Sequence, residues 1–245
     1  LGDMKAPDVV LSHLGALVAY SEKDWATAKT GFEQVLPHLT DQPESAFEVN
    51  LLLADCCERL GLVDQQREAL ENAAKLDWTS IRALLDLADV QMRSGQLDEA
   101  IEDYRRVLRL PGAPPATHLS LAQALLTKTA RLPVAERNWI ELDTALDEAE
   151  KAMPNSPHVA ILRADVLAAR DQNQMAVDLL TTTKDRLQNE IDGLTRQRAA
   201  LLAEAESLSG DAKQKRLAEA DELSTRIDGW RGLQSTIWRS LVRFA

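Results

Sequence analysis

The stretch that decides the fold is IRALLDLADVQMRSGQLDEAIEDYRRVLRLPG, residues 81–112. Apolar residues recur at helical spacing up to Gly95, and the same spacing resumes after Gly95 until Pro111 stops it. The pattern predicts a helix, a tight turn and an antiparallel second helix. Because a pair this short cannot bury its apolar face alone, it needs similar pairs stacked on either side.

A second copy of the pattern lies earlier in the chain. Leu53 precedes Leu87, and Gly61 precedes Gly95, by 34 residues in each case. These positions, with Tyr104 and the closing Pro111, resemble the tetratricopeptide repeat, a family whose repeat is about 34 residues long. The resemblance implies an all-α fold, a right-handed superhelix of about five helix pairs.

We expect this solenoid to occupy residues 1–183. Its helix pairs are predicted at 9–40, 47–78, 81–112, 115–154 (with an inserted loop at 127–139) and 157–183. Trp78 stands where the closing Pro of the second repeat would sit, and a wedge between repeats is the preferred interpretation over a ligand-stacking residue. A heptad pattern then continues without Pro from Gln174 to about Leu208. It predicts a protruding antiparallel coiled-coil hairpin at 184–229, followed at 230–245 by the start of a further, truncated repeat.

Composition favours helices and disfavours several kinds of partner. Only three Phe and two Tyr occur, and 45% of the residues are hydrophobic. The net charge of −11 argues against nucleic acid and against an anionic membrane surface. No apolar run approaches the ~20 residues that cross a bilayer, so direct membrane insertion is not expected.

The chain begins at Leu1, which suggests a piece of a larger bacterial repeat protein. We expect a cytoplasmic protein; if a signal peptide has been removed, we expect a periplasmic one.

The sequence contains no constellation that predicts catalysis. Its four His residues, His13, His38, His118 and His158, are scattered over three predicted repeats, and Cys56 and Cys57 are adjacent within a predicted helix. A phosphate-binding glycine loop and a nucleophile elbow are both missing from the sequence. We therefore expect no enzyme activity, no cofactor and no metal.

The resemblance also implies a binding groove lined by the first helix of every pair. Carrying the groove-facing positions of the family onto this chain gives the candidate partner-binding residues Glu48, Asp55, Glu58, Arg59, Arg82, Asp89, Met92, Arg93, Gln123 and Asp165. Some family members hold a peptide carboxylate with Lys and Asn, but Asp55, Asp89 and Asp165 occupy such places here. Carboxylates beside Leu and Met favour a basic and apolar segment. The alternative is that they only pair with arginines along the wall.

These observations lead to two functional hypotheses. The first is a non-enzymatic scaffold that binds a partner segment in the groove, with possible self-association through the hairpin. The second is a structural spacer or regulatory arm of a larger enzyme or of an envelope or secretion assembly, with no peptide in the groove. The repeat resemblance by itself does not choose between them.

Overall fold

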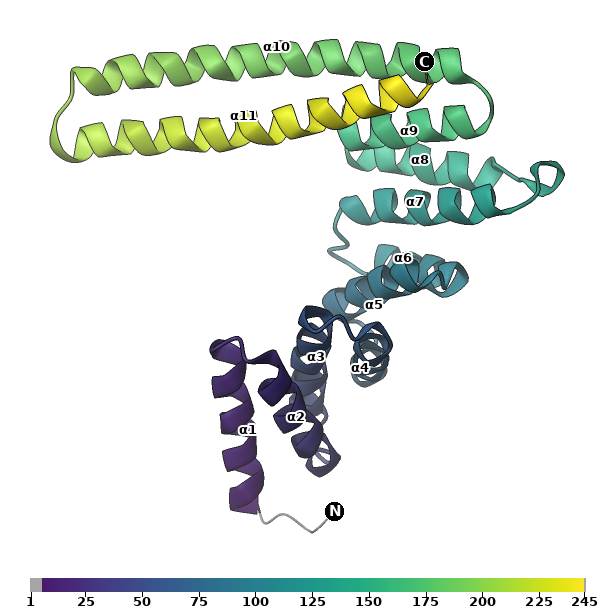
Figure 1. Ribbon diagram of the computed structural model, residues 1–245, viewed down its shortest axis with the longest axis vertical. Helices are drawn as coiled ribbons and strands as arrows, with labels where there is room; N and C mark the ends of the chain where they lie inside the picture. Colours follow the sequence, from purple (N-terminus) through teal and green to yellow (C-terminus); the bar gives the residue numbers. More distant parts are fainter. Residues whose placement is uncertain (1–5, 245) are drawn as a thin grey trace. The chain divides into compact units, whose positions relative to one another are not determined.

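The computed structural model describes residues 6–244, which are almost entirely helical (Figure 1). The α-helices are α1 (Ala6–Ser21), α2 (Trp25–Val35), α3 (Pro43–Arg59), α4 (Val63–Leu76), α5 (Ile81–Ser94), α6 (Leu97–Arg109), α7 (Ala116–Arg131), α8 (Ile140–Ala152), α9 (Pro157–Ala169), α10 (Asn173–Glu206) and α11 (Gly210–Phe244). Short 3-10 turns lie at Leu36–His38 and Val134–Glu136. Within residues 6–244 there is no β-strand, which confirms the all-α prediction.

The chain divides into two compact units, Leu1–Ala145 and Leu146–Ala245. In the first unit, consecutive helices pair as α1 with α2, α3 with α4 and α5 with α6. The second helix of each pair also packs against the first helix of the next pair. Ala28, Ala88 and Ala100 are fully buried. Small side chains at these positions let helices approach closely, so a core of modest side chains forms a continuous stack.

Glycines close the turns of the two pairs that the sequence pattern relates. Gly95 caps α5 with φ 79, and its N–H donates to the carbonyl of Met92 at 3.1 Å. Gly61, after α3, has φ 71. Side chains with a Cβ rarely adopt this left-handed conformation, so glycine is favoured at both turns, although Lys23 and Asp171 adopt it after α1 and α9. The 34-residue spacing of these glycines therefore reflects one repeated turn.

The inserted loop of the fourth pair is shorter than predicted. We expected it at 127–139, but α7 stays helical to Arg131. The helix-breaking residue, Pro133, lies two residues beyond that end, so nothing stops the helix at residue 127. Arg137 then ties the loop back to the end of α7. Its guanidinium donates to the carbonyls of Leu132 at 3.0 Å and Ala130 at 3.3 Å. Such donors satisfy carbonyls that a helix end leaves without partners.

The second unit is built on two long helices, α10 of 34 residues and α11 of 35 residues. They lie side by side as a hairpin, as the heptad pattern predicted (Figure 1). A hydrophobic core lies between the two helices in the outer part of the hairpin and contains Ile191, Leu194 and Ile227. Nearer α9, a second core contains Leu180 and Ile237.

The hairpin differs from the sequence prediction at its boundaries. Residue 184 lies inside α10, and α11 continues without a break through residue 230. A helix tolerates internal glycines such as Gly232 at a cost of about 1 kcal/mol each, and neither a proline nor a turn signal stops α11 there. The last part of α11 nonetheless packs its apolar residues onto α9 and α10, as the first helix of a further repeat would.

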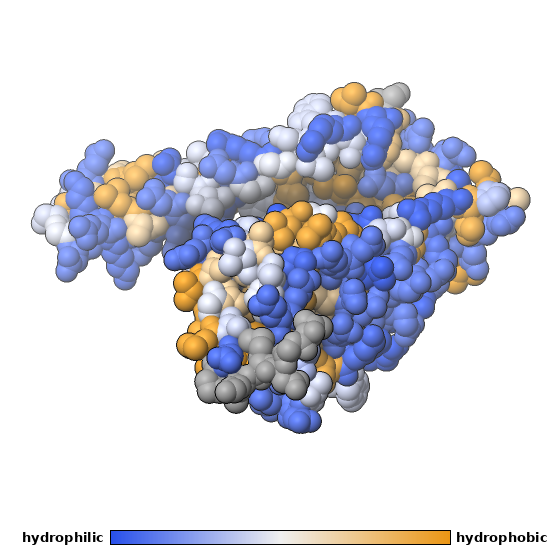
Figure 2. All heavy atoms as spheres, turned by 60° about the horizontal axis from the view of Figure 1, so that its bottom comes forward, coloured by the Kyte–Doolittle hydropathy of each residue, from blue (hydrophilic) through white to orange (hydrophobic). Residues whose placement is uncertain are grey.

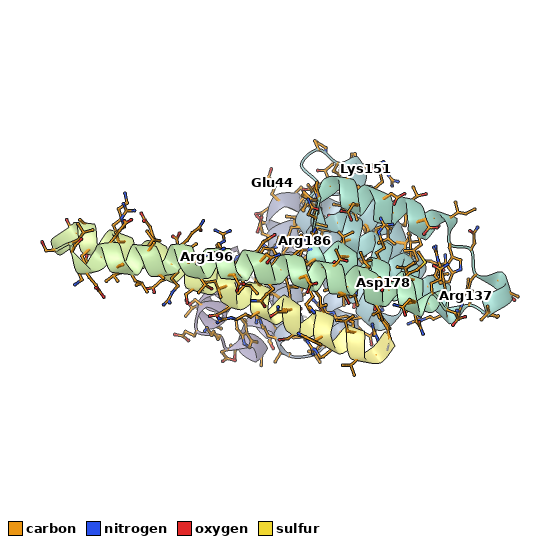
Figure 3. All side chains as sticks on the ribbon, turned by 90° about the horizontal axis from the view of Figure 1, so that it is seen from above. Glu44, Arg137, Lys151, Asp178, Arg186 and Arg196 are labelled. Atoms are coloured by element: carbon orange, nitrogen blue, oxygen red, sulfur yellow. The ribbon has the colours of Figure 1, made fainter. Side chains whose placement is uncertain are left out.

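Polar contacts complete the second unit. Arg243 near the end of α11 forms an ion pair with Asp165 on α9. Arg186, which Figure 3 labels on α10, donates to Asn155 at 3.0 Å to the side-chain oxygen and 2.8 Å to the carbonyl. Much of the surface in Figure 2 is hydrophilic. Within residues 6–244, none of the helices combines the length and hydropathy that a bilayer crossing requires.

Candidate functional site

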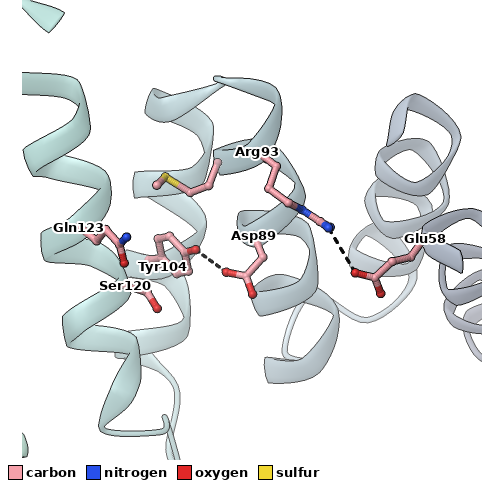
Figure 4. A pocket seen from close by; sticks show the side chains of 7 residues that line it. Glu58, Asp89, Arg93, Tyr104, Ser120 and Gln123 are labelled. Atoms are coloured by element: carbon pink, nitrogen blue, oxygen red, sulfur yellow. Dashed lines mark hydrogen bonds and ion pairs between the residues drawn. The ribbon is translucent and has the colours of Figure 1, made fainter. Parts of the chain in front are cut away.

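Two adjoining cavities lie along the first helices of the pairs in the first unit. The larger, of about 460 Å³, is lined by Glu58, Asp89, Met92, Arg93, Tyr104, Ser120 and Gln123 (Figure 4). The other, of about 280 Å³, is lined by Leu51, Ala54, Asp55, Glu58, Gln66, Leu70, Arg82, Asp86, Asp89 and Arg93. They share Glu58, Asp89 and Arg93, so we treat them as one feature, the α3–α5–α7 groove.

The repeat spacing places most of the predicted residues in this groove. Asp55, Asp89 and Gln123 stand 34 residues apart and occupy matching places on α3, α5 and α7. Seven of the ten predicted residues line the groove, namely Asp55, Glu58, Arg82, Asp89, Met92, Arg93 and Gln123. Whether they contact a partner stays a prediction.

Three predicted residues lie elsewhere. Glu48 stands seven residues before Asp55, about 10 Å along the helix axis, and lines a separate cavity with Pro43. Arg59 points over the ring of Trp25, with 5.8 Å between its guanidinium carbon and the ring centroid. Asp165 belongs to the second unit, where Arg243 holds it in an ion pair.

Two groove carboxylates accept hydrogen bonds from tyrosines. Tyr104 of α6, only 2% exposed, donates its hydroxyl to Asp89 at 2.5 Å (Figure 4). Tyr20 of α1 donates its hydroxyl to Asp55. Burial and the bond to Asp89 raise the pKa of Tyr104, and the bond to Asp55 with burial raises the pKa of Tyr20 to about 12. Both hydroxyls therefore stay protonated at neutral pH and hold the two carboxylates in place.

Arg93 joins three helices across the groove. Its guanidinium pairs with Glu58 of α3 at 3.3 Å (Figure 4). It also donates to Gln66 of α4 at 3.1 Å. Charge-assisted bonds of this kind fix side chains more firmly than neutral ones. Part of the groove charge is thus neutralised by wall arginines, as the alternative interpretation of the sequence anticipated.

Asp86 is the groove carboxylate that sequence reasoning missed. It faces the second cavity, and its nearest cation, Arg82, lies 3.7 Å away. Burial raises the pKa of Asp86; Arg82 opposes this rise, and the charges of Asp89, Glu58 and Asp55 add to it. The available signal was its position three residues before Asp89, which places both carboxylates on one helix face.

Metal-ligating clusters and exposed thiols are both lacking among the described residues. Within residues 6–244 there is no group of three or more His, Cys, Asp or Glu side chains that could hold a metal ion. Cys56 and Cys57 are buried, and burial raises the pKa of both thiols. Thiols in this state pack as small hydrophobic groups.

The tyrosine contacts predict an unusual alkaline titration. Both tyrosines of the chain have a raised pKa, so tyrosinate absorbance should stay flat through about pH 10, where an ordinary tyrosine ionises. The tyrosine pKa is higher in the folded than in the unfolded protein, so the two hydrogen bonds stabilise the fold. Their contribution is complete below about pH 10 and declines as pH rises toward about 12. Spectrophotometric titration of the wild type and of Tyr20→Phe checks this. A transition near pH 10 in the folded protein would contradict the hydrogen bonds.

Comparison with known proteins gives a consistent picture of the fold. Residues 85–140 match the tetratricopeptide repeat family model. No curated protein matches the chain. A crystal structure of MamA superimposes with a TM-score of 0.61 at 15% identity, covering 74% of this chain and 93% of that chain.

Two further structures share the superhelical fold. YrrB, described as a TPR protein with an unusual peptide-binding site, gives a TM-score of 0.57 at 13% identity over 73% of this chain and 86% of that chain. The C-terminal part of a TPR repeat-containing protein from Cytophaga hutchinsonii gives 0.54 at 11% identity, covering 94% and 93%. At such identities the likeness concerns the fold alone.

Proposed function

Because the chain is a tetratricopeptide-repeat protein, we propose that it is a non-enzymatic scaffold that holds a partner segment in the α3–α5–α7 groove. The repeat fold supports a role in protein–protein interaction in general. The peptide-binding site described for the similar protein YrrB supports the finer proposal that a segment enters a groove.

The observation that carries the proposal is a surplus of carboxylates over cations in one continuous groove. Asp55, Glu58, Asp86 and Asp89 line it together with Arg82 and Arg93, and a third cation, Arg59, lies 3.6 Å from Asp55. Leu51 and Met92 add apolar surface. A segment that presents a basic side chain beside apolar ones complements this lining.

Asp86 is the carboxylate best placed to receive the basic side chain. Asp55 and Asp89 already accept tyrosine hydroxyls, and Glu58 is paired with Arg93. The side chain of Asp86 is 48% exposed; burial and, after it, the charges of Asp89, Glu58 and Asp55 raise its pKa, and Arg82, 3.7 Å away, only partly opposes them. A bound Lys or Arg would relieve that repulsion, so we expect the strongest electrostatic gain there.

We therefore predict that Asp86→Asn weakens binding without weakening the fold. The substitution keeps the shape and removes a charge that its surroundings disfavour, so thermal stability should stay equal or rise. Affinity for a basic peptide should fall about three- to tenfold. Peptides would be selected from a displayed random library on the wild type and measured by fluorescence anisotropy on both proteins.

The matched control is Asp64→Asn, which removes one negative charge from an α4 carboxylate that is 93% exposed and lies outside the groove. It should leave the affinity unchanged at moderate salt. Selected peptides that bind the wild type and Asp86→Asn equally would refute the groove assignment. Selection of no peptide at all would favour the spacer hypothesis.

A further inference from the structure

Large apolar side chains are exposed at many places, but four of them gather on α1. Val10, Leu11, Leu14 and Val18 are each more than half exposed. Trp78, in the link between α4 and α5, is 66% exposed as well. The sequence had favoured Trp78 as a wedge between repeats, but a side chain so exposed is not buried between helices. Trp78 lies outside the helices, whereas the four residues of α1 form one continuous surface, which we term the α1 face.

The α1 face is the open side of a helix that is apolar all round. α1 packs mainly against α2, at the edge of the first unit (Figure 1). Its inner side, which includes Ala16 and Ala19, is buried in the core. Residues 9–21 contain no Asp, Glu, Lys or Arg, so the outer side is apolar too. Helices of this composition are normally buried on every side, which indicates that the α1 face is a contact surface.

The apolar surface continues from the α1 face into a hollow of about 560 Å³. Val9, Leu17 and Leu39 line this hollow together with Val10 and Leu14. Its described lining residues include no carboxylate, lysine or arginine. The first unit therefore presents projecting apolar side chains and an apolar recess next to each other.

Gly15 lies at the centre of the α1 face. Leu11, Leu14, Gly15 and Val18 fall within an arc of about 100° on the helix surface. A side chain at Gly15 would meet no described atom within 4 Å, so packing within the described chain does not require a glycine there. Glycine also weakens a helix relative to alanine. The gap that it leaves allows another helix to approach closely.

We propose that the α1 face is a self-association surface, on which a second copy of this chain docks its own α1 in antiparallel orientation. A two-fold axis between residues 14 and 15 places Leu14 of each copy over Gly15 of the other. The same axis places Leu11 opposite Val18. The largest side chain at the centre therefore meets the smallest, twice, so the surface is complementary to itself.

The charges also favour a second copy. Each copy carries a net charge of −11, so two copies repel one another wherever their acidic surfaces meet. The α1 face brings no like charges together, because the charged residues nearest to it, Asp8, Glu22 and Lys23, lie at its two ends. A charged segment would lose hydration here without gaining an ion pair, and an anionic membrane surface would need cations that residues 9–21 lack.

The size of the surface sets the expected affinity. α1 has 16 residues, fewer than the about 20–30 residues a side that a standard interface uses. We therefore expect a weak dimer with a Kd on the order of 10–100 µM. Because the two copies repel, the dimer should tighten about three- to tenfold when salt is raised from about 50 to 500 mM.

Sedimentation equilibrium of the whole chain tests the proposal. The average mass should rise from 27.1 kDa toward twice that value as the protein concentration rises from about 1 to 500 µM. Leu14→Glu and Leu11→Glu each place two like charges in the contact, so both should weaken the dimer at least about tenfold. Both sites are exposed, so the thermal stability of the monomer should change little. The matched control is Val242→Glu, at a 78% exposed site on α11, which should dimerise as the wild type does.

Cysteine cross-linking tests the antiparallel orientation. Leu14→Cys places two thiols beside the two-fold axis, so mild oxidation should link the copies. Val18→Cys places them about 10 Å apart along the helix axes, which is too far for a disulfide. The native Cys56 and Cys57 are buried and should not react.

Three results would overturn the proposal. The first is a wild type that stays monomeric up to about 500 µM at both salt concentrations, whether or not it then sediments with phosphatidylcholine vesicles, which would assign the α1 face to a membrane. The second is equal weakening by Leu14→Glu and Val242→Glu. The third is equal cross-linking of Leu14→Cys and Val18→Cys. Asp86→Asn should dimerise as the wild type does, so this test is independent of the α3–α5–α7 groove.

Discussion

Replacing Phe32 with alanine should unfold the first helix pair while the neighbouring repeats stay folded. Phe32 of α2 is fully buried and meets the rings of His13 and Tyr20 edge to face, at centroid distances of 6.4 and 6.3 Å. Truncating such a side chain costs about 3–5 kcal/mol. Because helices in a solenoid contact only their neighbours, the loss should stay local.

Hydrogen exchange measured by mass spectrometry checks this expectation. Amides of α1 and α2 should exchange much faster in Phe32→Ala, and amides of α5 and α6 should keep their protection. Val18→Ala is the matched control, since Val18 lies on α1 and is 55% exposed. Loss of protection throughout the first unit would show that the repeats unfold as one cooperative block.

This substitution also reaches the proposed binding groove. The hydroxyl of Tyr20 on α1 is the donor that holds Asp55 on α3. When α1 unfolds, Asp55 loses that donor while Arg59 remains 3.6 Å away. The first helix pair therefore acts on the groove by orienting one of its carboxylates.

Replacing Ile237 with alanine should detach the last part of α11. Ile237 is fully buried in a core with Leu180 and Ala164, and its truncation costs about 2–5 kcal/mol. The ion pair between Arg243 and Asp165 depends on the same docking, so it should be lost as well. The outer hairpin core at Ile191 and Ile227 is a different cluster that meets this one through the half-buried Trp230, and it should persist.

The control for this prediction is Val242→Ala, on the same helix at a position that is 78% exposed. Faster exchange in α9 and in the last turns of α11 is expected for Ile237→Ala only. Equal exchange in the two variants would mean that the end of α11 contributes little to the second unit. Simultaneous loss of protection along all of α10 would mean that the hairpin depends on this core.

The groove shows where sequence reasoning about a site succeeds and where it stops. Asp55, Asp89 and Gln123 were found because repeat spacing places equivalent residues on equivalent helices. Asp165 was carried over by the same rule, yet it lies in a different unit and pairs with Arg243. Asp86 was missed because it falls outside the groove positions of the family, although it lies one turn from Asp89.

The sequence by itself determined the helices, the glycine turns and the long hairpin. Each of these follows from local causes: the period of the apolar residues, the left-handed φ that Gly61 and Gly95 adopt, and a heptad run with no proline. Each of these signals depends on residues close together in the sequence, so the sequence alone is enough to predict the structure that it favours.

Only the tertiary structure decided which carboxylates are engaged, how far α11 extends and that Trp78 is exposed. Tyr20 reaches Asp55 across 35 residues and Arg243 reaches Asp165 across 78. The continuity of α11 reflects packing on α9 and α10 that outweighs the cost of its glycines. These outcomes depend on contacts between side chains that are far apart in the sequence. Repeat spacing specifies where the helices lie but not which of these contacts form.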